Sequence, residues 1–445
     1  MKNARDHDSP LNVDTNRRRV LGGLGLAAAT CPFSGLMIGR AEAKTNLDAG
    51  PASGHVTDAP VLNSASPDDH VPFLGRHQAG IVTPRPAHGM IASFHVVAQT
   101  PDELDALLRR LTQRIAFLTE GGTPPELDPR LPPADSGIVG PVVRPDALTV
   151  TVALGASLFE DREWLAPLKP LRLTRMTRFP NDALDASLCH GDLTLQICAN
   201  TQDTTIHALR DIIKNLPDRL VLKWKQEGNV PVIAPGPGGV AQSARNFLGF
   251  RDGSANPDAA DTALMDRLVW VGPERGEPQW AERGSYQLVR VIRNFVERWD
   301  RTPLREQELI MGRARNTGAP LDRLEASEFD TPDYAADPDG LATPLDSHIR
   351  LANPRTPQSD ENVILRRPFN YSNGVTRAGQ LDQGLLFICY QADLEKGFIA
   401  VQRRLDGEPL EEYIKPVGGG YYFALPGVAD ASDYLGSSLM AAMTR

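Results

Sequence analysis

The sequence has 445 residues, of which 41% are hydrophobic and 23% charged, and its formal net charge is −9 at pH 7. These values are typical of a globular protein, and the length allows two domains or one large domain. The first 43 residues carry six basic and four acidic side chains, so the remainder has a net charge of −11. Such an acidic body argues against nucleic acid or an anionic membrane as the main partner, and no later apolar run approaches the length of a membrane span.

The N-terminus has the pattern of an export signal. Three arginines within Asn16–Leu21 precede a Gly/Ala/Leu-rich run to about Ile38, and the small-x-small sequence Ala41–Ala43 follows. A basic region, an apolar region and a small-residue cleavage site define a signal peptide, and the paired arginines resemble a twin-arginine signal. A membrane anchor is the alternative, but the run is short and Pro32 interrupts it. We therefore expect export by the twin-arginine machinery, cleavage after Ala43 and a periplasmic protein.

Residues 44–70 are rich in Ala, Ser, Pro, Asp and Gly, which predicts a flexible linker. A first domain is predicted over residues 71–235. Thr100 followed by Pro101 is typical of a helix start, and leucines at helical spacing continue to about Leu118. The expected elements alternate as β-α-β-β-α-β, the ferredoxin-like order: strand 90–98, helix 100–118, strands 147–154 and 192–199, helix 201–215 and strand 220–225.

A second domain is predicted over residues 236–445, with a similar mixture of strands and helices but no repeat of the first half at residue level. The fold class is therefore α+β, with a second ferredoxin-like half as a structural hypothesis. Once the signal is removed, three cysteines remain within apolar runs, which favours buried small hydrophobes over disulfides or metal ligands. The expected elements of this half are strands 284–291, 384–391 and 420–425, helices 302–311 and 393–405, and a polar loop over 322–346.

The stretch Asn246–Pro257 places an acid, Asp252, between Gly249 and Gly253. Taken alone, Asp-Gly is a common turn dipeptide. Two downstream residues, His348 and Arg366, change that interpretation. A haem peroxidase needs an imidazole as the iron's protein ligand, and a proton carrier and a cation on the opposite face. These three residues are of the required types.

Three segments in this order carry a family resemblance: Gly249-x-x-Asp252-Gly253, the run His348–Arg355, and Arg366. Together with Tyr413–Gly420 they make the sequence similar to the dye-decolorizing peroxidases, most closely the twin-arginine-exported, EfeB-type deferrochelatase/peroxidases. The resemblance extends from about Arg76 to the C-terminus. It implies two ferredoxin-like halves with antiparallel sheets flanked by helices, in a dimeric α+β barrel-like arrangement with haem in the C-terminal half.

The resemblance also implies a role for each matching residue. His348 would bind the iron of one haem b per chain, Asp252 would carry the proton, and Arg366, preferred over its neighbour Arg367, would stabilise developing negative charge. The remaining residues expected to line or contact the haem are Gly253, Ser254, Ala255, Asn353, Pro354 and Arg355, the last group through a propionate. An aspartate has a reference pKa of about 3.9, so we expect the pH optimum of dye oxidation to be acidic.

The resemblance implies a peroxidase that reduces hydrogen peroxide and oxidises an organic or porphyrinogen-type donor, in connection with iron acquisition. Two alternatives stay open: a deferrochelatase that releases iron from haem with the tetrapyrrole intact, and an exported haem-binding protein without enzymatic activity. Expected partners are iron-uptake permease components and a second copy of the chain. Surface aromatic residues are candidates for relaying electrons from bulky donors, although packing is the favoured explanation for each: Trp270, Trp299, Tyr371 and Tyr390.

Overall fold

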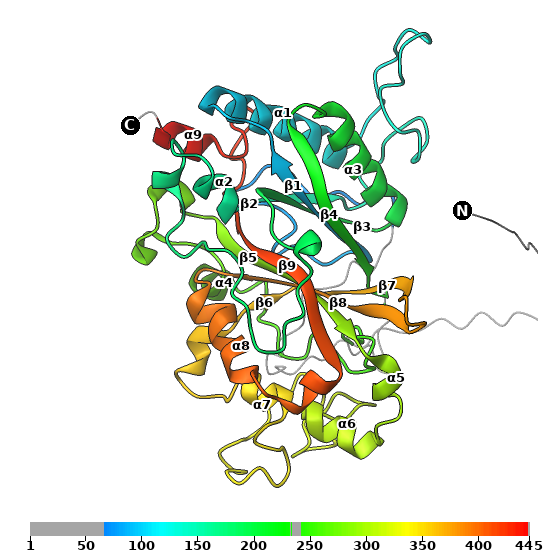
Figure 1. Ribbon diagram of the computed structural model, residues 1–445, viewed down its shortest axis with the longest axis vertical. Helices are drawn as coiled ribbons and strands as arrows, with labels where there is room; N and C mark the ends of the chain where they lie inside the picture. Colours follow the sequence, from blue (N-terminus) through cyan, green and yellow to red (C-terminus); the bar gives the residue numbers. More distant parts are fainter. Residues whose placement is uncertain (1–65, 232, 234–241, 444–445) are drawn as a thin grey trace, which may run out of the picture. The chain divides into compact units, whose positions relative to one another are not determined.

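A computed structural model describes residues 66–231, 233 and 242–443 of the chain (Figure 1). The predicted signal peptide and nearly all of the predicted linker lie outside these residues. In the part that is described, no helix is both long and apolar enough to cross a lipid bilayer. The described residues belong to a single structural unit.

The first half has the predicted ferredoxin-like order. Its strands pair antiparallel in the order β2-β3-β1-β4. Helix α1 begins as expected, because Thr100 and Glu103 form a capping box, and its leucine stripe is fully buried. Helices α1 and α3 lie together against this sheet (Figure 1). The elements are β1 (His88–Val96), α1 (Pro101–Glu120), β2 (Thr149–Gly155), α2 (Ala156–Glu160), β3 (Leu193–Ala199), α3 (Gln202–Asn215) and β4 (Leu220–Asn229).

The second half repeats this strand order, which confirms the α+β class and the duplicated arrangement. Its strands pair antiparallel as β9-β5-β8-β7, with the two-residue strand β6 also on β8. The two sheets join at Ala153–Gly155 with Tyr422–Ala424, and at Asn229 with Asn370, so the combined sheet closes like a barrel. The strands are β5 (Ser285–Asn294), β6 (Leu365–Arg366), β7 (Phe369–Val375), β8 (Leu381–Gln391) and β9 (Ile414–Ala424).

The helices of the second half are shorter than those of the first. The single helix predicted for residues 393–405 is instead a π-turn (Glu395–Ile399) continued by α8, with a break at Gly397 (φ −79°, ψ −110°). A Cβ at Gly397 would lie 2.8 Å from the Gln391 side chain, so the close approach requires glycine. The α-helices are α4 (Thr262–Leu268), α5 (Val296–Trp299), α6 (Leu304–Met311), α7 (His348–Ala352), α8 (Ala400–Leu405) and α9 (Ser437–Met443).

Single turns of 3₁₀ helix connect several of these elements. They are Ala166–Leu168, Ala186–Leu188, Pro273–Arg275, Gln279–Ala281, Ser359–Asn362 and Pro409–Glu412. The stretch predicted as a polar loop, 322–346, contains only turns and bends. Cys189, Cys198 and Cys389 are buried free thiols, as the sequence indicated.

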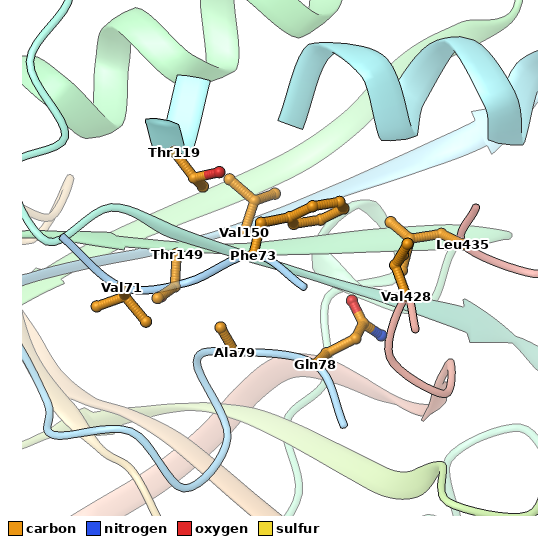
Figure 2. A pocket seen from close by; sticks show the side chains of 9 residues that line it. All are labelled: Val71, Phe73, Gln78, Ala79, Thr119, Thr149, Val150, Val428 and Leu435. Carbon is orange, nitrogen blue, oxygen red and sulfur yellow. The ribbon is translucent and has the colours of Figure 1, made fainter. Parts of the chain in front are cut away.

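One small cavity lies inside the first half, between the chain before β1, strand β2 and the C-terminal segment (Figure 2). Its volume of about 10 Å³ admits no more than a water molecule. It is therefore a packing defect of the core, not a ligand site. Its lining residues are Val71, Phe73, Gln78, Ala79, Thr119, Thr149, Val150, Val428 and Leu435.

Candidate active site

A much larger cavity, of about 270 Å³, opens in the second half. Strands β5, β8 and β9 form one wall, and residues of α7, α8 and the segments around them form the others. Its volume is close to the range of about 300–1,000 Å³ that is usual for cofactor sites. Asp252, His348 and Arg366, which are far apart in the sequence, all line this cavity. The structure therefore brings the three predicted site residues together.

Asp252 is held by a tight turn at the start of the second half. Its backbone N–H donates to Ala244 O at 2.8 Å, and the side chain of Asn246 accepts from the N–H of Phe250 at 3.2 Å. Gly249 within this turn has φ of +88°, which favours glycine, and the Arg315 side chain occupies the space where a Cβ would lie. The backbone conformation of the turn and the nearby Arg315 side chain therefore explain why the predicted motif has a glycine at position 249.

Arg366 lies beside Asp252 in the cavity. Its Nη1 donates to Asp252 Oδ1 at 2.8 Å, and the two side chains are 27% and 13% exposed. The backbone of Arg366 is fixed by Asn256, whose side chain accepts from its N–H at 2.8 Å and donates to its carbonyl at 3.0 Å. The acid and the cation are therefore placed together by the same turn, in a charge-assisted pair.

His348 is the first residue of α7, and a buried carboxylate fixes its ring. Nδ1–H donates to Glu408 Oε2 at 2.7 Å, and the Glu408 side chain is only 4% exposed. Burial lowers the pKa of His348, but the charge and hydrogen bond of Glu408 outweigh it, so the pKa is raised above its ordinary value. Nε2, which has no hydrogen-bond partner among the described residues, is left as the nitrogen available to a ligand.

The residues after α7 form a strained turn at the cavity. Asn353 Oδ1 accepts from Arg355 N–H at 3.0 Å and from Ser359 Oγ at 2.9 Å. Arg355 has a left-handed backbone (φ +58°), which is unfavourable for an arginine and typical of residues constrained by their surroundings. Asn353 and Arg355 line the cavity, whereas Pro354 is not among the lining residues.

Some of the other residues predicted to contact the haem also line the cavity, and some do not. Ser254 and Ala255 line the cavity, but Gly253 does not. The neighbour Arg367 is directed elsewhere, because its guanidinium donates to the carbonyls of Thr83 and Pro84. This geometry supports the choice of Arg366. The prediction of surface electron relays was wrong in its placement, because none of the four aromatic residues is more than 5% exposed: Trp270, Trp299, Tyr371 and Tyr390.

The cavity walls are mainly apolar. Leu385 and Phe387 alternate inward along β8, and Ile292 of the paired strand β5 lies beside Leu385 in the ladder. An ion pair between Arg290 and Asp182 adds a polar patch, with both side chains at most 1% exposed. A flat, apolar cofactor whose iron binds an imidazole nitrogen fits such a lining.

An imidazole backed by a carboxylate, in an apolar cavity that also holds an acid–arginine pair, defines a haem peroxidase as the class of protein. Residues 78–229 match the N-terminal domain of Dyp-type peroxidases, and residues 243–429 match the C-terminal domain. The chain belongs to the Dyp-type peroxidase family, the family that the sequence resembled, and it is a haem-dependent enzyme.

Curated relatives cover almost the whole chain. A protein named deferrochelatase from Escherichia coli O6:K15:H31 is 54% identical over 430 residues, 96% of this chain and 97% of that protein. One of the same name from Shigella flexneri is 53% identical over 428 residues, with the same coverage.

Solved structures agree on the fold. A DyP-type peroxidase from Cellulomonas bogoriensis superposes with a TM-score of 0.74 at 35% identity, covering 84% of this chain and 99% of that one. Ferric DtpA from Streptomyces lividans also gives 0.74, at 33% identity, covering 86% and 100%. The haem cofactor of the family fits the residues present here, because the walls are apolar and Nε2 of His348 has no partner in the part of the chain that the structure describes.

Glu408 was missed from the sequence. It lies 60 residues beyond His348, in the segment Gly407–Leu410, where an acid before a proline has the appearance of a surface turn. Pairing of a ligand histidine with a carboxylate is expected on chemical grounds, but several acids follow α7 and nothing in their spacing selects this one.

Proposed function

We propose that this protein reduces hydrogen peroxide with haem b bound through Nε2 of His348, and that Asp252 and Arg366 perform the proton and charge chemistry. The observation that carries the proposal is the presence of two pairs, Asp252 with Arg366 and His348 with Glu408, in one cavity. The remaining cofactor contacts in this proposal come from Ser254, Ala255 and the Asn353–Arg355 turn. Gly253 and Pro354 contribute through their backbone, which holds these neighbours in place.

Each side chain has a defined task in this proposal. When bound, haem supplies the iron and the electrons for peroxide reduction. Asp252 accepts a proton from one peroxide oxygen and donates it to the other, which leaves as water. Because Oδ1 accepts from Arg366, Oδ2 is the atom that carries this proton. Arg366 stabilises the negative charge that develops as the O–O bond breaks, and Glu408 keeps the His348 proton on Nδ1.

The test uses the mature protein from Lys44 onward, reconstituted with haemin. We expect a high-spin ferric absorption spectrum that is lost in His348→Ala. In Asp252→Asn and Arg366→Gln we expect haem to remain bound while the rate constant for peroxide falls by at least about 100-fold, as for loss of a general acid–base or an electrostatic group. Exposed Asp266→Asn serves as the control. Peroxide reduction at an unchanged rate in both catalytic variants would refute the assigned roles.

We also propose a second activity, release of iron from haem with the tetrapyrrole intact. The support is specific, since relatives 54% identical over 96% of the chain carry the name deferrochelatase. Incubation with haem should produce the fluorescence of free protoporphyrin. Ring-cleavage products, or no free porphyrin at all, would contradict this activity, and the protein would then be a peroxidase only.

Location and organisation complete the proposal. We propose twin-arginine export, cleavage after Ala43 and action in the periplasm as a homodimer with iron-uptake permease components as partners. We also propose domains over 71–235 and 236–445 that follow the linker 44–70, in keeping with the family matches over 78–229 and 243–429. N-terminal sequencing of the protein recovered from the periplasm, and its mass in solution, test the cleavage site and the dimer.

A further inference from the structure

Asp252 lies at the base of a short hairpin, and a buried acid from another loop contacts both sides of that base. The hairpin closes through an antiparallel bridge between Arg245 and Arg251 and through the bond from Asp252 N–H to Ala244 O. The acid is Glu328, in the loop that follows α6, and it is 5% exposed. A buried carboxylate in this place requires a structural or functional explanation.

The carboxylate of Glu328 joins the residue before the hairpin to a residue after it. Its Oε1 accepts from the N–H of Ser243 at 3.0 Å. Its Oε2 accepts from the hydroxyl of Ser243, and from the hydroxyl of Ser254 at 3.4 Å. Ser254 lines the large cavity, whereas Glu328 does not. These three contacts, which we call the Glu328 clamp, therefore act on the hairpin from outside the cavity.

An ion pair with Arg251 does not account for the clamp. Nε of Arg251 lies 3.7 Å from Oε1 of Glu328, which is too long for a hydrogen bond. The terminal nitrogens of Arg251 donate instead to Ser243 O at 2.7 Å and to Gln242 Oε1 at 2.6 Å. Arg251 therefore balances the buried charge without bonding to it, and the carboxylate oxygens are directed to the two serines.

The loop that carries Glu328 is itself held in place. Nη1 of Arg313 donates to Glu328 O at 2.9 Å and to Gly318 O at 2.8 Å. Gly318 has φ of +80°, and a Cβ there would lie 2.8 Å from Cβ of Glu328 and 2.9 Å from Cγ of Arg251. Glycine at this position lets the loop pack closely against the hairpin. Glu328 thus reaches the hairpin from an anchored backbone, as a clamp requires.

We propose that Glu328 is a positioning residue, which holds both ends of the hairpin and so keeps the Asp252 carboxylate in contact with Arg366. The inference rests on the proposed roles of Asp252 and Arg366, and it adds a residue that acts by geometry and not by its charge. A proton carrier must lie within hydrogen-bond reach of the group that it serves. A displacement of about 1 Å can cost about 100-fold in rate.

The test compares three replacements of Glu328 in the haem-loaded protein by the rate constant for peroxide. Glu328→Gln keeps the length of the side chain and its hydrogen bonds, because a serine hydroxyl can accept as well as donate, so its rate constant should stay within about threefold of wild type. Glu328→Asp keeps the charge but is one methylene shorter, and Glu328→Ala removes the clamp. Each of these two should lower the rate constant by about tenfold or more. Glu325→Ala, at an exposed acid of the same loop, is the matched control.

A second measurement separates positioning from a general loosening of the fold. If Glu328 acts only through Asp252, Glu328→Ala should slow the wild-type protein but not slow Asp252→Asn any further. An equal further loss in Asp252→Asn would overturn the proposal. A slow Glu328→Gln beside a normal Glu328→Asp would also overturn it, because the effect would then depend on charge.

The remaining outcomes separate this inference from the proposed function. If Glu328→Ala does not bind haem, Glu328→Asp supplies the same comparison. A slow Asp252→Asn beside unaffected Glu328→Asp and Glu328→Ala would refute the positioning role alone. An Asp252→Asn protein as fast as wild type would refute the proposed proton carrier itself.

Discussion

Replacement of Glu408 by glutamine tests the site most directly. The carboxylate accepts from Nδ1–H of His348 at 2.7 Å and is 4% exposed, so the substitution removes a buried charge and keeps an oxygen that can accept the same hydrogen bond. Loss of a carboxylate behind a ligand histidine typically lowers metal affinity by about 10–100-fold. This corresponds to about 1.4–2.8 kcal/mol. We expect haem affinity to fall by this amount, measured by haemin titration. Glu412→Gln, an exposed acid of the same turn, is the matched control.

The same variant makes a pH prediction for the haem-free protein. Because Glu408 outweighs the effect of burial and raises the pKa of His348, their pairing stabilises the folded state below the unfolded-state pKa of histidine, about 6.5. This contribution is lost as the pH rises through the higher folded-state pKa. Glu408→Gln should therefore cost more unfolding free energy at about pH 5.5 than at about pH 9, measured by urea denaturation. If Glu408→Gln lowered the free energy of unfolding equally at both pH values, the pairing of Glu408 with His348 would not be the cause. If Glu412→Gln lowered haem affinity as much as Glu408→Gln, the effect would not be specific to the carboxylate behind His348.

Three other predictions concern the core and the chemistry. Thr149→Val should stabilise the protein by about 1 kcal/mol in urea denaturation, because its buried Oγ1 has no hydrogen-bond partner within the described residues. Thr151→Val on the same strand should cost about as much, because it loses a 2.7 Å hydrogen bond to a backbone carbonyl. Arg290→Met should cost about 3–5 kcal/mol because it leaves Asp182 buried without a cation, and joint replacement of both by apolar residues should recover most of that loss. Asp252→Asn should abolish an acidic optimum of dye oxidation, recorded as rate against pH; an optimum unchanged by the substitution would contradict the assignment of the proton carrier.

The sequence predicted the regular elements of the first half well because local signals and packing agree there. The capping box at Thr100 and the leucine stripe of α1 specify the same helix that the sheet then buries. The second half was less predictable. Strand β7 was missed because Asn370, Ser372 and Gly374 give it a polar, turn-like composition, and it becomes a strand through pairing with β8.

The residues of the site likewise include some that the sequence could predict and some that it could not. Asp252, His348 and Arg366 could be selected because each sits in a recognisable local motif. Glu408 could not, since its importance depends on the distant histidine that the fold brings beside it.

The two halves share one strand order, yet only the second encloses the large cavity, and the helices explain the difference. In the first half, the 20-residue helix α1 and the 14-residue helix α3 cover their sheet with buried leucines and isoleucines and leave no more than a water-sized gap. In the second half, the corresponding place after β8 holds a π-turn broken at Gly397 and the six-residue helix α8. Shorter, broken helices leave the inward side chains of β5 and β8 uncovered, and residues from the surrounding loops line the same cavity. A cofactor bound at the proposed site would fill a volume that helix packing occupies in the first half. Its removal should therefore loosen the second half more than the first, with faster amide hydrogen exchange in β5 and β8 than in β1 and β3.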